Sequence, residues 1–115
     1  MSLIYHLITR TAWEVARPAS EYRAESLETE GFIHCSQDLE QMLRVANRLY
    51  TGRDDMLVLQ LDTDRLTSPL KREPSRSGEI YPHIYGPLNI NGVVRVLSLE
   101  ADANGSFSSV QGMTG

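Results

Sequence analysis

Three histidines are the residues of this chain best suited to chemistry at neutral pH. His6, His34 and His83 lie in residues 4–8, 31–36 and 80–87, three short segments rich in aromatic and β-branched residues. An imidazole donates a hydrogen bond, accepts one or carries a positive charge close to neutral pH. Three imidazoles confined to extended apolar segments therefore predict one shared pocket.

Each of these residues also has a structural interpretation. A strand histidine beside tyrosine and leucine is more often packed against a carbonyl than bound to a ligand. Cys35 follows His34, and neighbouring residues of a strand point to opposite faces. If His34 faces the cavity, Cys35 therefore faces the core. This predicts a buried thiol that is not a nucleophile. Ser36 is interpreted first as a helix cap, with a ligand contact of its hydroxyl as a secondary role.

The length and the net charge of the chain limit the classes of protein to which it can belong. The 115 residues fit one domain, and the formal net charge of −4 argues against non-specific binding to nucleic acid or to an anionic membrane. The single cysteine has no partner for an internal disulfide, and no apolar stretch approaches the roughly 20 residues of a membrane span. We therefore expect a soluble cytoplasmic protein with a small-molecule ligand. The oligomeric state is left open.

The first half of the chain predicts two strands and three helices. Residues 3–8 have the composition of a strand, and Thr11 with Glu14 forms a capping-box pattern at the start of a helix that carries Trp13 inward. A short helical turn opened by Ser26 is expected next. Two further elements follow: a strand at residues 32–35 and a long amphipathic helix at residues 36–50, capped by Ser36.

The second half predicts strands. Residues 56–61 indicate a buried strand, residues 70–73 a short edge strand and residues 93–99 a final strand. Pro82 cannot donate to a ladder, which predicts that its strand lies at an edge or carries a bulge. We expect one α+β domain over residues 1–100, followed by a disordered Gly/Ser-rich tail at residues 101–115.

Two of the histidine segments form motifs that are specific enough to compare with known families. Residues 30–36 read Glu-Gly-Phe-Ile-His-Cys-Ser and residues 82–88 read Pro-His-Ile-Tyr-Gly-Pro-Leu, with Tyr-His-Leu at residues 5–7. Together they resemble the bacterial family catalogued as domain of unknown function 952, over roughly residues 4–96. The resemblance implies an ADP-ribosyltransferase-like fold, in which two small mixed or antiparallel sheets and two to three helices surround a cleft.

That fold resemblance also implies roles for particular residues. His6 is expected to bind the ribose on the adenosine side of NAD, and His34 the ribose on the nicotinamide side. The third motif of that fold usually supplies a glutamate that stabilises the oxocarbenium-like transition state, and Glu79 and His83 are both candidates. The predicted set comprises two groups: His34, His83 and Glu79 as catalytic residues, and His6, Ser36 and Tyr85 as residues that bind NAD or a related ligand.

Three classes of function remain open from the sequence. The first is a transferase or hydrolase acting on NAD, ADP-ribose or a phosphorylated nucleotide, with Arg48, Arg72 and Arg76 as candidate phosphate ligands. The second is a non-catalytic binding module with the same pocket. The third is a metal site built from the three histidines, which ranks last because they lack the short spacing that preorganises metal ligands.

Overall fold

The computed structural model describes residues 2–112 and confirms the α+β class. Within the described residues the strands pair antiparallel throughout, in three sheets rather than the two expected. The elements run in the order β1 (Leu3–Thr9), α1 (Arg10–Ala16), β2 (Glu21–Tyr22), α2 (Glu25–Thr29), β3 (Ile33–His34), α3 (Leu39–Tyr50), β4 (Met56–Asp62), β5 (Leu70–Pro74), β6 (Ile80–Ile84), β7 (Leu88–Asn89), β8 (Val93–Ala101) and β9 (Phe107–Gly112). Two 3₁₀ turns, Thr63–Arg65 and Ile90–Gly92, connect strands in the second half.

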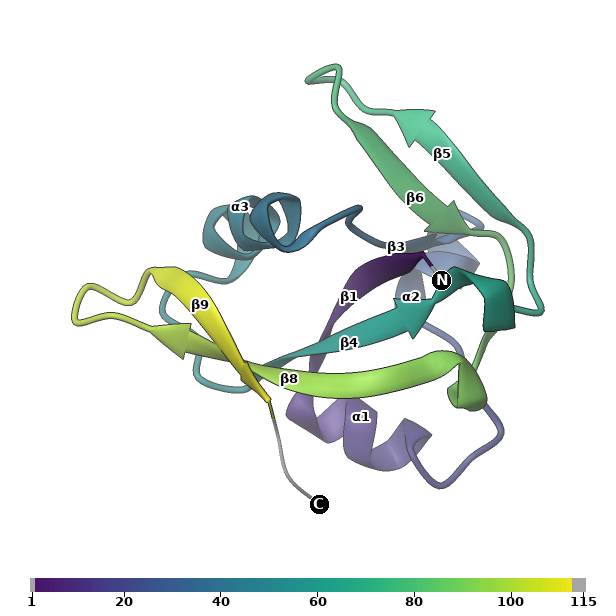
Figure 1. The fold of residues 1–115 in the computed structure, drawn as a ribbon, viewed down its shortest axis with the longest axis horizontal. Helices are drawn as coiled ribbons and strands as arrows, with labels where there is room; N and C mark the ends of the chain where they lie inside the picture. The colour runs from purple at the N-terminus through teal and green to yellow at the C-terminus, as the bar shows by residue number, and fades with distance from the viewer. Residues whose placement is uncertain (1, 113–115) are drawn as a thin grey trace.

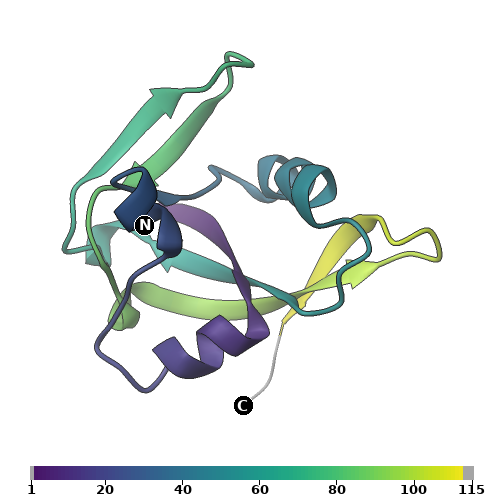
Figure 2. The same ribbon diagram turned by 180° about the vertical axis from the view of Figure 1, so that it is seen from behind.

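A four-stranded sheet in the order β1-β4-β8-β9 forms the centre of the molecule. Helix α3 lies over one face of this sheet and α1 lies under the other (Figures 1 and 2). Because both faces are covered, β4 is apolar at nearly every position, and Leu57 and Leu59 pack toward Trp13 of α1. Val58 has the opposite parity and packs with Met42 of α3.

A second sheet, in the order β3-β6-β5, carries two of the three histidines. Its β5–β6 hairpin projects from the body of the molecule beside α3 (Figure 1). The expectation of an edge position for the Pro82 strand is wrong, because β6 pairs with β3 on one side and β5 on the other. Pro82 accepts a hydrogen bond from the Cys35 N–H but has no N–H to return, and the β3 ladder ends at His34.

The first two helices begin at residues other than the predicted caps. Helix α1 is capped by Thr9, whose hydroxyl accepts from the Ala12 N–H, rather than by Thr11. Ala24 occupies the cap position of α2 without a side-chain bond, so Ser26 lies inside that helix rather than at its start. Propensity patterns locate a helix end only within one or two residues, since several polar residues compete for the same position.

The cap predicted at Ser36 is also wrong. Helix α3 is capped by Asp38, whose carboxylate accepts from the Gln41 N–H at 2.8 Å. The backbone of Ser36 instead exchanges two hydrogen bonds with the backbone of Tyr5. Ser36 therefore links the end of β3 to the outer edge of β1, and this link brings the first two histidine segments together.

Residues 101–112 are ordered, which corrects the expectation of a disordered tail. Strand β9 pairs with β8 through a turn, and Phe107 is buried against α3. Asn47 of α3 fixes the start of β9, because its side chain bonds both the N–H and the carbonyl of Phe107, at 2.7 and 2.9 Å. Residues 113–115 lie outside the described part of the chain.

Candidate functional site

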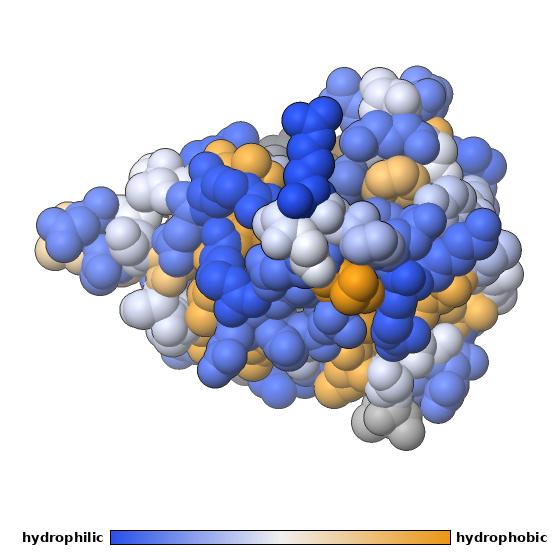
Figure 3. Space-filling view, turned by 90° about the horizontal axis from the view of Figure 1, so that it is seen from above, coloured by the Kyte–Doolittle hydropathy of each residue, from blue (hydrophilic) through white to orange (hydrophobic). Residues whose placement is uncertain are grey.

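A cavity of about 480 Å³ lies between β1, the three-stranded sheet and α3, within the size range of small-ligand sites. All three histidines line it, as the sequence predicted, with Ser36 and Arg48. Tyrosines 5, 22, 50 and 81 supply most of its aromatic surface. The remaining exposed surface seen from above is largely hydrophilic, with apolar residues in scattered patches (Figure 3).

Strand alternation explains how the three-stranded sheet presents its histidines. His34 of β3 is directly opposite His83 of β6, and Lys71 of β5 is opposite His83 on the other side. These residues share one surface of the sheet, the histidine face, which also carries Glu73 opposite Tyr81. The other surface carries apolar side chains that pack into the core: Ile33, Ile84, Leu70 and Pro82.

His6 is buried and has a protein partner at each ring nitrogen. A carbonyl oxygen only accepts, so the Nδ1–H of His6 donates to the backbone oxygen of His34, at 2.6 Å. The Nε2 atom then accepts from the Tyr22 hydroxyl at 3.3 Å. Burial lowers the pKa of His6 to about 4 and raises the pKa of Tyr22 to about 12. Both groups are therefore uncharged at neutral pH, and the two bonds of His6 fix β3 and β2 against β1.

His83 is held by Glu73, a residue outside the predicted site. The carboxylate accepts from the Tyr85 hydroxyl at 2.5 Å and from His83 Nδ1 at 2.8 Å, and these bonds hold the pKa of Glu73 below its ordinary value. The same carboxylate raises the pKa of Tyr85. With its proton on Nδ1, a neutral His83 presents Nε2 as an acceptor. Glu73 and His83 share a face of the sheet only in the observed register of β5 and β6, and the sequence does not reveal this register.

His34 forms a second pair of imidazole and carboxylate. Its Nε2 lies 2.8 Å from Glu30 at the end of α2, and the side chains of both residues are about half exposed. Gly31 reverses the chain between them with a φ of +88°, which favours glycine. The rings of His34 and His83 lie 5.5 Å apart at 83°, and Phe32 stacks on His83 at 4.0 Å.

Two predicted site residues lie away from the cavity lining. Glu79 is bound by Arg44 and Gln41 of α3 and by the Tyr81 hydroxyl, and the Arg44 hydrogen bond is the main cause of its lowered pKa. Tyr85 belongs to the Glu73 network, with Lys71 over its ring at 4.7 Å. The structure thus brings together four of the six predicted residues: His6, His34, His83 and Ser36.

Cys35 has the environment that its strand parity predicted. It is buried beside Ile33 in the core, and burial raises the pKa of its thiol far above the ordinary value. The sulfur therefore stays protonated at neutral pH, although the residue borders the cavity.

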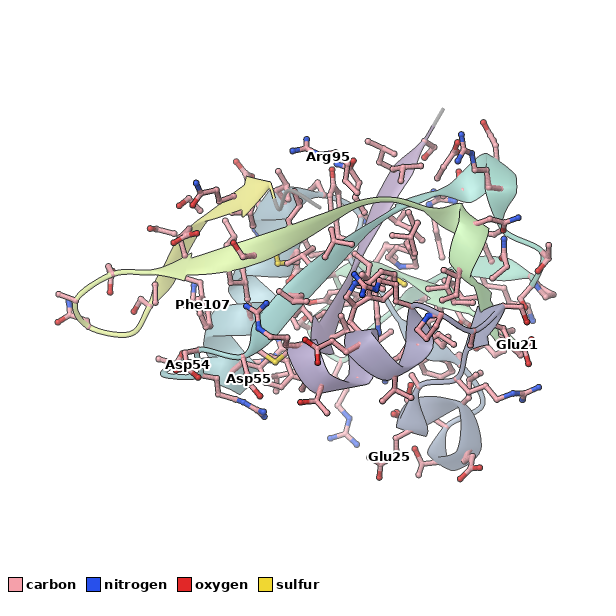
Figure 4. All side chains as sticks on the ribbon, turned by 90° about the horizontal axis from the view of Figure 1, so that it is seen from below. Glu21, Glu25, Asp54, Asp55, Arg95 and Phe107 are labelled. Atoms are coloured by element: carbon pink, nitrogen blue, oxygen red, sulfur yellow. The ribbon has the colours of Figure 1, made fainter. Side chains whose placement is uncertain are left out.

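The charges around the cavity are unbalanced. Among residues 2–112, the lining contains Arg48 but no aspartate or glutamate. Glu30 and Glu73 lie outside the lining and bind His34 and His83, which are part of it. Four acidic residues labelled in Figure 4, Glu21, Glu25, Asp54 and Asp55, lie at the periphery of the molecule. Of the three arginines predicted as phosphate ligands, Arg48 lines the cavity and Arg72 and Arg76 do not.

Metal-ligating groups are not clustered in the described residues. Within 2–112, no three or more histidine, cysteine, aspartate or glutamate side chains are arranged to hold a metal ion. The structure thus adds no support to the third alternative, a metal site of three histidines. In the same range, no helix is long and apolar enough to cross a membrane.

Comparison with known families confirms the resemblance seen in the motifs. A family model described as a protein of unknown function (DUF952) matches residues 7–96. The chain belongs to the DUF952 family. That match includes the histidine face and α3, and so most of the cavity. No curated protein matches the chain.

Solved structures similar to this DUF952 chain come from the bacterium Caulobacter crescentus. The crystal structure of its protein CC0527 has a TM-score of 0.82 and 31% identity, with 93% of this chain and 94% of that chain covered. The solution structure of CC0527 has a TM-score of 0.78 and 33% identity, with 91% and 90% covered. CC0527 is described as a structural genomics target, and this description names no activity.

Proposed function

We propose that the cavity of this DUF952 protein binds a small anionic ligand of the nucleotide class, such as NAD, ADP-ribose or a phosphorylated nucleotide. The observation that carries the proposal is the lining itself. It combines the imidazoles of His34 and His83, one arginine and several hydroxyl groups, and within residues 2–112 it has no carboxylate. Such a set offers hydrogen-bonding groups and one positive charge to a phosphate.

The remaining lining suits the other parts of a nucleotide. Tyr50 and Tyr81 offer aromatic surface on which a base can stack, and such stacking is worth roughly 1–3 kcal/mol per base. We assign the ribose oxygens to the hydroxyls of Ser36 and Ser75 and to the ring of His34, which all line the cavity. The ADP-ribosyltransferase-like cleft implied by the motifs is compatible with this arrangement and forms part of the proposal.

Phosphate chemistry fits this lining better than cleavage of a glycosidic bond. Positive charge develops on the ribose when the bond to nicotinamide breaks, and a nearby carboxylate is the group that stabilises it. Glu79, the predicted carboxylate, is bound to Arg44 outside the lining. Glu30 and Glu73 are each bound to an imidazole.

Calorimetric titration tests the proposal. We expect wild-type protein to bind adenosine 5′-monophosphate, ADP-ribose or NAD more tightly than adenosine, because only the first three carry phosphate. Arg48→Gln should weaken the phosphate-containing ligands roughly 10- to 150-fold, as a charge-assisted hydrogen bond of about 1.5–3 kcal/mol is lost.

Arg72→Gln is the matched control, since Arg72 is exposed and has the strand parity of the face opposite the histidines. Its affinities should equal those of wild type. Absence of binding to all three phosphate-containing compounds at millimolar concentration rejects the proposal, and so does equal weakening by the two arginine variants.

A further inference from the structure

The histidine face carries two imidazoles, and each is hydrogen-bonded to a glutamate. His34 and His83 lie opposite each other across β3 and β6, and each has one ring nitrogen bound to a glutamate at 2.8 Å. Their ring centroids are 5.5 Å apart. Two oxygens of one phosphate group, each bonded to an imidazole nitrogen at about 2.7–3.2 Å, span a separation of this order.

The two histidines differ in burial, and this difference suggests a separate chemical role for each. The side chain of His83 is 13% exposed and Glu73 binds its Nδ1, so in the neutral ring Nε2 is the nitrogen that can accept a proton. The side chain of His34 is 54% exposed, so its ring is open to solvent while Glu30 binds its Nε2. His83 is thus suited to be the base and His34 the acid.

We propose that His34 and His83 form an acid–base pair that hydrolyses a nucleotide phosphodiester, with a nucleoside 2′,3′-cyclic phosphate as the substrate class. This inference rests on the proposed function, because the same cavity must first bind the nucleotide. Arg48 supplies the single cation of the described lining, which matches a diester with one negative charge. A monoester carries nearly two charges at neutral pH, since its second pKa is about 6.

The reaction balances with water as the second reactant. His83 Nε2 takes a proton from water while the water oxygen bonds to phosphorus. The bond from phosphorus to one ribose oxygen breaks, and the leaving oxygen takes the proton of the His34 imidazolium. The product is a nucleoside monophosphate ester with one free ribose hydroxyl. His83 then loses the acquired proton to solvent, and the exposed His34 regains one.

Several charged or titratable groups surround the pair. Glu30 from α2 faces His34, and Glu73 from β5 faces His83. Tyr85 shares Glu73, Lys71 lies over the Tyr85 ring, and buried His6 bonds the His34 carbonyl. We assign Glu73 as a positioning residue, because it touches His83 rather than the phosphate.

Hydrolysis of adenosine 2′,3′-cyclic monophosphate by the full chain, followed by separation of the 2′- and 3′-monophosphates, tests the inference. We expect wild-type activity to rise and fall with pH, since one histidine must be neutral and the other protonated. His34→Ala and His83→Gln should each lower kcat roughly 100- to 10,000-fold. Each should also remove one limb of the profile, the alkaline limb for His34→Ala and the acid limb for His83→Gln.

Glu73→Gln should lower kcat at least about tenfold with KM little changed, and it should shift the acid limb, because His83 loses the partner that fixes its tautomer. A residue with a purely structural role would leave that limb in place. Arg72→Gln is the control outside the histidine face and should retain wild-type kcat and KM.

The outcomes separate this inference from the proposed function. Binding of adenosine 5′-monophosphate without hydrolysis of the cyclic nucleotide overturns the acid–base pair and leaves the binding site intact. Absence of binding rejects both proposals. Hydrolysis that survives in His34→Ala identifies another source of activity and also overturns the inference. His34 is exposed, so its alanine variant is expected to fold, and thermal unfolding checks this for every variant.

Discussion

His6 and the pair of His34 and His83 border the same cavity but are used differently by the fold. His6 is 6% exposed, and both of its ring nitrogens are engaged by the protein. His34 and His83 each keep one ring nitrogen on a carboxylate and belong to a sheet surface that faces the cavity. A shared residue type and a shared cavity therefore do not indicate a shared role. Burial and the nature of the hydrogen-bond partner distinguish His6 from the other two imidazoles.

The largest expected effect is on stability at His6. His6→Ala removes a buried ring and leaves the His34 carbonyl and the Tyr22 hydroxyl without their partner. We expect a loss of roughly 3–5 kcal/mol in the free energy of unfolding, measured by urea denaturation. His34→Ala should change the same quantity by less than about 1 kcal/mol, because the His34 side chain and its bond to Glu30 are solvent-exposed. Equal losses in the two variants would remove the distinction between the two histidine environments.

The pH dependence of stability sharpens the same comparison. The pKa of His6 is about 4 in the folded protein, below the ordinary value of 6.5. The unfolded chain therefore binds more protons between these values, so this contribution is fully present above pH 6.5 and is lost as the pH falls toward 4. The loss amounts to roughly 3 kcal/mol at its limit.

His6→Asn isolates this contribution, because its amide can still donate to the His34 carbonyl but does not titrate. We expect the difference in unfolding free energy between wild type and His6→Asn to shrink as the pH falls from 6.5 to 4. The carboxylates with lowered pKa values, Glu73 and Glu79, also lose stabilising interactions in acid, but both proteins share them. A difference that stays constant across this range would contradict the neutral state of His6.

The fold was predictable where local pattern alone determines structure. The strand at residues 3–8, the amphipathic helix α3 and the buried strand β4 were all expected, because their apolar periodicity reflects burial directly. The prediction of a disordered tail is wrong, because β9 is stabilised by long-range contacts. Asn47 and Phe107, which are hydrogen-bonded, are 60 residues apart in the sequence. No local pattern contains that information.

The site was predictable to the extent that its residues share motifs. The convergence of the three histidines on one cavity was expected, and the structure confirms it. Their carboxylate partners were not identified, because the pairing of Glu73 with His83 depends on the register between β5 and β6. Glu30 lay inside a quoted motif, yet its bond to His34 depends on the reversal at Gly31.

Glu79 gives the smallest expected effect and the sharpest contrast with Glu73. The two glutamates flank the same hairpin, but Glu79 is bound by Arg44 and Gln41 of α3, whereas Glu73 is bound by His83 and Tyr85. Glu79→Gln should leave nucleotide affinity and any turnover of the cyclic nucleotide near wild-type values. It should lower the melting temperature slightly, because an exposed ion pair between hairpin and helix is lost. Loss of turnover with affinity retained would instead make Glu79 the missing third-motif carboxylate. It would then favour transfer chemistry at the ribose over the acid–base pair on the histidine face.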